Sequence, residues 1–166
     1  MKEKSSKYKT IDVIIETPRN CRNKYTYDKK EKAFRLKKIL PAGAVFPFDF
    51  GFIPGTKGED GDPLDVLVIM DEPAYPGCII ECYILGAIKA KQTEHGETVQ
   101  NDRLIAVSSV SHTHNDLREI KDLNENILKE IEHFFISYNE EAGKTFQPEG
   151  WADSAEAMKL IKEGKR

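Results

Sequence analysis

The chain has 166 residues, of which 39% are hydrophobic and 32% are charged, and its formal net charge is −3. This length and composition are typical of one globular domain, so we expect a single domain over residues 1–166 and exclude an intrinsically disordered chain. The sequence has no basic bias, which argues against nucleic acid as a partner, and no apolar run is long enough to cross a membrane.

Two further features of the sequence favour a cytoplasmic protein. Residues 1–7 lack the apolar core of a signal peptide, and the three cysteines are odd in number and lack the spacing of zinc ligands. Cys78 and Cys82 lie in an apolar segment, where we expect both to be buried as small hydrophobic side chains. A reducing cytoplasm fits this cysteine content.

The first two thirds of the chain carry strand patterns. Apolar side chains alternate along residues 11–16 until Pro18 stops the pattern. Residues 25–27 and 34–36 flank a polar turn and predict a β-hairpin. Further strands bounded by proline, glycine or polar residues are predicted at 66–70, 77–90 and 103–109.

The last third of the chain changes to helical spacing. After the candidate caps Asp122 and Asn124, apolar residues recur three or four positions apart at Ile127, Leu128, Ile131, Phe134, Phe135 and Tyr138. We expect this helix to end near Gly143, and a second, shorter helix to begin at Asp153 or Ser154. Many short strands followed by two helices predict an α+β fold with a small β-barrel at its centre.

The segment 58–65 is the most informative part of the sequence. It crowds Asp60, Asp62 and Asp65 onto a turn that glycine and proline make rigid, and an apolar run follows at once. Carboxylates repel one another, so a fold that holds them together usually does so to bind a hard cation such as Mg²⁺. A plain surface turn is the alternative, because Asp, Gly and Pro are ordinary turn residues.

Several motifs between residues 11 and 151 resemble those of the family I inorganic pyrophosphatases, and they occur in the same order. The most specific is Asp60-Gly61-Asp62-Pro63-Leu64-Asp65-Val66, which resembles the signature D-G-D-P-x-D-V. The other segments that resemble family motifs are Arg22-Asn23-Lys24-Tyr25, the aromatic stretch 46–54, the turn and strand 76–81, the helical stretch 133–138 and Glu149-Gly150-Trp151.

This resemblance implies a distorted, OB-like five-stranded barrel with two C-terminal helices packed against it. It implies a homo-oligomer as well, which in bacteria is often a hexamer. The implied reaction is the Mg²⁺-dependent hydrolysis of pyrophosphate to two phosphates, with Mn²⁺ as an alternative metal. Such a reaction needs metals to neutralise charge, cations to hold the phosphates and a carboxylate to activate water.

The resemblance also assigns parts of this reaction to particular residues. Asp60 and Asp65 would bind a pair of metal ions, and Asp62 between them would accept the proton of the attacking water. Lys24 would hold a phosphate as a point charge, and Tyr138 would donate a hydrogen bond.

At other positions the match is looser. Glu16 would lie in the outer part of the acidic site as a further metal ligand. Lys38 stands where the family has a phosphate-clamping arginine, so it keeps the charge for substrate binding but loses the bidentate fork. Thr26 replaces a glutamate, Phe50 replaces a tyrosine, and Asn139 replaces a lysine.

The largest departure lies just before the last predicted strand. Gln92 replaces an acidic residue, and we expect a long polar loop to follow it. Asn101 then replaces a metal-binding aspartate, and Arg103 replaces a lysine at a substrate-binding position. Asp102 is one residue out of register, and a slip of one residue points a strand side chain to the other face. Glu94 or Asp102 would complete the metal site only if the loop reshapes it.

Two hypotheses for function follow. The first is an inorganic pyrophosphatase whose activity or metal requirement is altered by the lost contacts, since each charge-assisted contact is worth about 1.5–3 kcal/mol. The second is a degenerate homologue that binds metal and phosphate without efficient turnover. The replaced residues favour the second hypothesis, and the intact aspartate trio favours the first.

Overall fold

The computed structural model describes residues 8–166, so the segment 1–7, which by sequence lacks the apolar core of a signal peptide, lies outside the described residues. The elements in chain order are β1 (Thr10–Thr17), β2 (Asn23–Asp28), β3 (Ala33–Ile39), β4 (Asp49–Phe52), β5 (Asp65–Ile69), β6 (Ile79–Glu94), β7 (Glu97–Gln100), β8 (Arg103–Ser108), the 3₁₀ turn η1 (Ile120–Asp122), α1 (Glu125–Glu141), β9 (Thr145–Ala152) and α2 (Ser154–Gly164).

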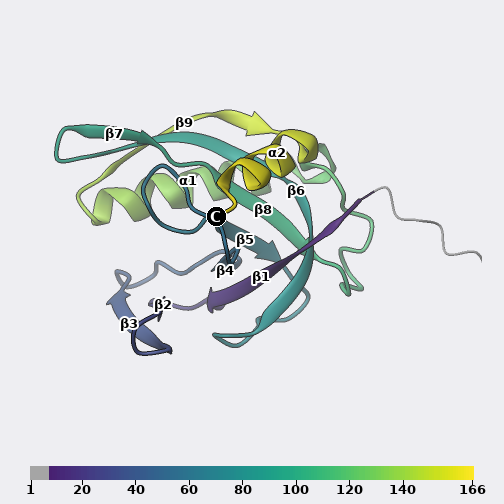
Figure 1. Ribbon diagram of the computed structural model, residues 1–166, viewed down its shortest axis with the longest axis horizontal. Helices are drawn as coiled ribbons and strands as arrows, with labels where there is room; N and C mark the ends of the chain where they lie inside the picture. Colours follow the sequence, from purple (N-terminus) through teal and green to yellow (C-terminus); the bar gives the residue numbers. More distant parts are fainter. Residues whose placement is uncertain (1–7) are drawn as a thin grey trace, which may run out of the picture.

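Five of the strands close into a barrel. β1 pairs with β4, β4 with β5, β5 with β8, β8 with β6, and β6 returns to β1, so the ring has no free edge (Figure 1). Only the pairing of β5 with β8 is parallel within this ring. With α1 and α2 packed against the barrel, the α+β fold predicted from the sequence is confirmed.

The long strand β6 holds the ring together because it bends. It pairs with β1, β8, β7 and β9 along its length, and its register to β8 shifts between Ile84 and Gly86. A Cβ atom on Gly86 would lie 2.2 Å from both the Ala152 carbonyl oxygen and Ile120 Cγ1, so only glycine fits this bend.

The two faces of the strands build two hydrophobic clusters, as the alternation along β5 illustrates. Leu67 and Ile69 pack into the cluster that receives Ile131 and Phe135 of α1. Val66 and Val68 pack into the other cluster with Ala157 and Ile161 of α2. Because both faces of β5 are buried, its sequence is a continuous apolar run, and this run places Asp65 at the edge of the core.

Capping residues set the helix boundaries. The Asn124 side chain accepts a hydrogen bond from the Asn126 backbone nitrogen at 2.8 Å and begins α1, and Gly143, at φ +75°, follows its end as predicted. Asp122, the other candidate cap, belongs to η1 instead. Asp153 begins α2 by accepting from the Glu156 backbone nitrogen at 2.9 Å.

Several strand predictions need correction. The hairpin and the core strands form as expected, but β4, β7 and β9 have no counterpart among the strands predicted from the sequence. The long polar loop expected after Gln92 is wrong: β6 continues to Glu94 and forms a hairpin with β7 through His95 and Gly96. Its polar side chains mislead because this hairpin is largely exposed, so no hydrophobic alternation is required there.

The expectation for the cysteines was half right. Cys82 is fully buried in β6, but Cys78 is exposed because it lies in the turn that precedes this strand. No helix within residues 8–166 combines the length and the apolar character needed to span a bilayer.

Candidate active site

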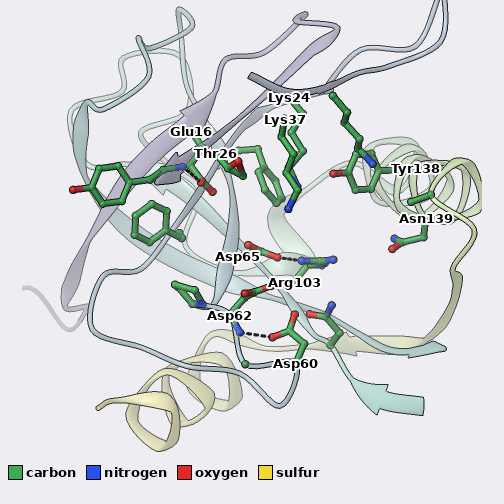
Figure 2. A pocket seen from close by; sticks show the side chains of 18 of the residues that line it. Glu16, Lys24, Thr26, Lys37, Asp60, Asp62, Asp65, Arg103, Tyr138 and Asn139 are labelled. Atoms are coloured by element: carbon green, nitrogen blue, oxygen red, sulfur yellow. Dashed lines mark hydrogen bonds and ion pairs between the residues drawn. The ribbon is translucent and has the colours of Figure 1, made fainter. Parts of the chain in front are cut away.

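A pocket of about 970 Å³ opens where the barrel meets the β2–β3 hairpin and the end of α1. It is lined by all nine residues singled out from the sequence, which are Glu16, Lys24, Lys38, Asp60, Asp62, Asp65, Asn101, Arg103 and Tyr138. Figure 2 shows the carboxylates of Asp60, Asp62 and Asp65 on one side and Lys24 and Lys37 on the other. The structure therefore gathers the predicted residues, although they come from widely separated parts of the chain.

The carboxylates lie on a turn that its own backbone holds in shape. The Gly58 nitrogen donates to the Asp62 carbonyl oxygen at 2.8 Å, and the Asp62 nitrogen donates to Asp60 Oδ1 at 3.1 Å (Figure 2). Gly61 adopts φ +87°, a conformation that other residues rarely adopt. Thr56 anchors the end of the turn, since its hydroxyl accepts from the Leu64 nitrogen.

The three aspartates share the pocket but do not converge on one point. Asp60 and Asp62 are exposed, whereas Asp65 begins β5 and forms an ion pair with Arg103. Within residues 8–166, no three His, Cys, Asp or Glu side chains are grouped closely enough to hold a metal ion by themselves. The pocket thus offers carboxylate oxygens that a cation would have to draw together.

Buried polar side chains form the floor of the pocket. Asn101 Nδ2 donates to Gln92 Oε1 at 2.8 Å, and the Arg103 guanidinium lies 3.5 Å from the same oxygen. The side chain of Arg103 is only 8% exposed, and it lies over the ring of Phe135. Burial lowers the pKa of Arg103, and the negative charges of nearby Asp60 oppose that shift.

Asp102 points away from this floor. Its Oδ1 accepts hydrogen bonds from the Ala90 nitrogen at 3.1 Å and from Gln100 Nε2 at 2.7 Å. It lines a second, smaller cavity of about 350 Å³ beside α2. Asn101 is therefore the side chain of this pair that faces the larger pocket.

Cationic side chains from the β2–β3 hairpin form the opposite wall. Lys24 Nζ lies 5.4 Å from the ring centre of Phe50 and 5.3 Å from that of Tyr138, and Lys38 Nζ lies 4.0 Å from the Tyr138 ring. A β-bulge shifts the register between Lys24 and Tyr25, and both Lys37 and Lys38 line the pocket. Sequence reasoning missed Lys37, because a bulge leaves no signal in the pattern of β3.

This wall is partly buried, and several positive charges lie close together in it. Burial, followed by repulsion from Arg103, lowers the pKa of Lys24 to about 8. Burial raises the pKa of the Tyr138 hydroxyl, while the positive charge of Lys38 opposes that shift. Such groups respond strongly to an anion, because binding would relieve the repulsion among the cations.

Glu16 occupies the boundary between the two walls. One of its carboxylate oxygens accepts a hydrogen bond from the Tyr27 backbone nitrogen at 2.8 Å, which ties β1 to the hairpin. Burial raises its pKa, and this hydrogen bond opposes the shift. Glu16 therefore has a structural contact as well as a place in the pocket lining.

The replaced residues have structural partners. Phe50 is 3% exposed and packs against Phe46 at 5.4 Å between ring centres, so it belongs to the core. Asn139 is buried, and its amide donates to the Phe135 carbonyl oxygen at 2.7 Å. At the rim, Glu94 and Lys144 form an ion pair, and no motif in the sequence pointed to Lys144.

Comparisons with known proteins agree with this geometry. The family model described as inorganic pyrophosphatase matches residues 13–166. The inorganic pyrophosphatase of Leifsonia xyli subsp. xyli is 39% identical over 154 residues, covering 92% of each chain, and that of Streptomyces coelicolor is 40% identical over 148 residues, covering 89% of this chain and 88% of the relative.

Solved structures give the same result for the fold. The crystal structure of inorganic pyrophosphatase from Thermus thermophilus is similar with a TM-score of 0.84 at 31% sequence identity, covering 96% of this chain and 90% of the other. The similarity therefore extends over nearly the whole barrel and both helices, and the chain belongs to the family I inorganic pyrophosphatases.

Proposed function

We propose that this protein hydrolyses inorganic pyrophosphate to two phosphates and that the reaction depends on Mg²⁺. The observation that carries the proposal is a single pocket with three aspartates on a rigid turn facing the lysines of the β2–β3 hairpin. Names of the relatives support the substrate, since the matched proteins are inorganic pyrophosphatases.

The donor set of the acidic turn fits a hard divalent cation. Asp60 and Asp65 would hold Mg²⁺ through carboxylate oxygens, with the Asn101 amide oxygen and Glu16 as outer ligands. The Asn101 oxygen suits this role because the amide nitrogen is the atom that bonds Gln92. When bound, the metal would neutralise phosphate charge and make a water molecule more acidic. Mn²⁺ also prefers such oxygen ligands and is expected to substitute.

The protein side chains would perform the remaining steps. Lys24, Lys38 and Arg103 would bind the phosphate oxygens, and the Tyr138 hydroxyl would donate a hydrogen bond. Asp62 is exposed on the turn and would take a proton from the attacking water. The water oxygen would form a bond to one phosphorus as this proton leaves. The bridging phosphorus–oxygen bond then breaks, and the second phosphate leaves with the bridging oxygen.

The assay that tests this proposal is phosphate release from pyrophosphate across separate Mg²⁺ and Mn²⁺ titrations. We expect turnover that is absent without metal and lost in Asp62→Asn. Glu59→Gln is a matched control, since Glu59 lies on the same turn but does not line the larger pocket. Phosphate binding without phosphate release would instead support the degenerate homologue.

We also propose a homo-oligomer, most consistent with a hexamer by family resemblance. Exposed apolar side chains support an interface: Tyr75, Ile79 and Val110 are 85%, 63% and 79% exposed. They lie near the start of β6 and the end of β8, which are paired strands. Light scattering should give a mass several times the 18.9 kDa of the chain, and a monomer at micromolar concentration would refute the idea.

A cytoplasmic location is the last part of the proposal. The three cysteines are free, as expected of a protein in a reducing compartment. Cell fractionation with a periplasmic or secreted marker as reference would test it.

A further inference from the structure

Glu94 and Lys144 form a charge pair at the rim of the pocket that the proposed mechanism does not use. Lys144 Nζ lies 3.3 Å from Glu94 Oε2, and both residues line the pocket. The pair lies near the end of α1, where Asn139 contributes an amide rather than a charge. Among the described residues of the pocket lining, α1 itself contributes no cation, and Lys144 supplies a positive charge next to its end.

The sheet register fixes this pair in place. Thr93 pairs with Thr145 in the antiparallel ladder of β6 and β9, so one step further along Glu94 lies opposite Lys144. Side chains alternate along a strand, so Glu94 points to the same side as Gln92, which lies in the pocket floor. Lys144 is brought there by the turn after α1, in which its nitrogen donates to the Asn139 carbonyl oxygen at 2.9 Å.

The ion pair is weak enough to exchange for another anion. The side chains of Lys144 and Glu94 are 31% and 45% exposed, and exposed pairs contribute little stability because water screens them. The Lys144 ammonium also affects the cationic wall that the β2–β3 hairpin forms. Burial is the main cause of the lowered pKa of Lys24, and Lys144 is one of the positive charges that add to it.

We propose that Lys144 separates from Glu94 and binds a phosphate group of pyrophosphate and, after cleavage, the phosphate product. This inference rests on the proposed function, because it assigns a residue to the same pocket. Glu94 acts as the resting partner of Lys144, and its carboxylate competes with the incoming phosphate. The binding of phosphate by Lys144 and the competition from Glu94 are both electrostatic, since an ammonium binds phosphate as a point charge.

The same strand offers a matched control. Lys91 forms an ion pair with Glu149 at 3.5 Å, and it is 52% exposed. Lys91 does not line the pocket, so Lys91→Gln removes one lysine charge and one exposed ion pair without changing the proposed contact. Any difference between Lys144→Gln and Lys91→Gln therefore reports on the position of the charge rather than on its loss.

The test measures binding of inorganic phosphate to the full chain by calorimetry in the presence of Mg²⁺, together with KM and kcat for pyrophosphate. We expect Lys144→Gln to weaken phosphate binding and raise KM by about tenfold with kcat changed by less than about threefold, because the contact exists before and during the reaction. Lys144→Arg should retain most of the affinity, and Lys91→Gln should resemble the unmodified protein.

For Glu94→Gln we expect the opposite effect on phosphate affinity. Removing the competing carboxylate should tighten phosphate binding by about two- to fivefold, since it frees Lys144 and removes a negative charge from the rim. In the double variant with Lys144→Gln this gain should shrink. Weaker phosphate binding in Glu94→Gln alone would overturn the competing role given to Glu94.

The outcomes separate this inference from the proposed function. In one outcome the unmodified protein hydrolyses pyrophosphate, but Lys144→Gln and Lys91→Gln have the same phosphate affinity and the same KM. This outcome would overturn the role of Lys144 and leave the proposed function intact. Phosphate binding that depends on Lys144 in a protein without turnover would support the contact and overturn hydrolysis. A folded protein that neither binds phosphate nor hydrolyses pyrophosphate would overturn both; circular dichroism of each variant checks the fold.

Discussion

The acidic and cationic walls of the pocket are built in different ways. Asp60 and Asp62 lie on one turn whose own hydrogen bonds hold its shape, and Asp65 follows it at the start of β5. The cations come from β2, β3 and the segment after α1, and only the tertiary fold brings them together. The acidic wall is therefore a local structure, whereas the cationic wall depends on strand register and on the closure of the barrel.

This difference has an energetic consequence. The carboxylates of Asp60 and Asp62 are exposed, so water solvates their charges and they lower the stability of the fold little. Arg103 is buried and Lys24 is partly buried, and burial disfavours their charged forms. Asp65 links the acidic turn to the floor of the pocket, because it follows the turn at the start of β5 and pairs with Arg103. Substitutions on the turn should thus change chemistry, and substitutions at the link should change stability as well.

The largest expected effect is at Asp62. Asp62→Asn removes the proposed proton acceptor and should lower kcat by about 1,000-fold, while the fold is retained because the residue is exposed. Phosphate release under saturating Mg²⁺ measures this, and urea unfolding checks stability. If Asp62→Asn keeps more than a tenth of the activity, another group accepts the proton.

The next effect separates Asp65 from Asp60. Asp65→Ala leaves the buried guanidinium of Arg103 without its carboxylate and should lower the free energy of unfolding by about 3 kcal/mol. Asp60→Ala should cost less than about 1 kcal/mol, since Asp60 is exposed. Both should lose metal-dependent activity. Equal stability losses in urea unfolding would contradict the linking role of Asp65.

A pH dependence should distinguish the cationic wall. Lys24, with a pKa of about 8, is protonated below that pH and loses its charge as the pH rises through it. Phosphate binding measured by ³¹P NMR without metal should therefore weaken by up to about tenfold from pH 7.5 to pH 9.5. In Lys24→Arg the affinity should stay level over this range, because a guanidinium remains charged. A parallel decline in both proteins would argue against Lys24.

The smallest effect concerns the floor. Asn101→Asp adds a negative ligand facing the pocket, so the Mg²⁺ concentration for half-maximal activity should fall by several fold. The Gln92 amide can turn to donate its nitrogen to the new carboxylate. Asp102→Asn should leave the Mg²⁺ requirement unchanged, since Asp102 faces the other cavity. A larger change in Asp102→Asn than in Asn101→Asp would reverse this assignment.

Much of the fold followed from the sequence where burial imposes a pattern. The alternation of residues 11–16 and the apolar run before Met70 predicted β1 and β5, because buried strands must be apolar. β7 escaped prediction because it is a polar, largely exposed strand that pairs with β6. β9 escaped because its buried residues Phe146 and Ala152 do not follow a regular alternation along the strand.

The sequence by itself determined the acidic turn and the membership of the family, since the D-G-D-P-x-D-V match lies within one contiguous segment whose glycine and aspartate residues fix their own geometry. Only the tertiary structure decided that Lys37 and Lys144 enter the pocket, that Asn101 faces it and Asp102 does not, and that Arg103 pairs with Asp65. These contacts depend on a bulge and on strand register, which pair residues distant in the chain and leave no local pattern.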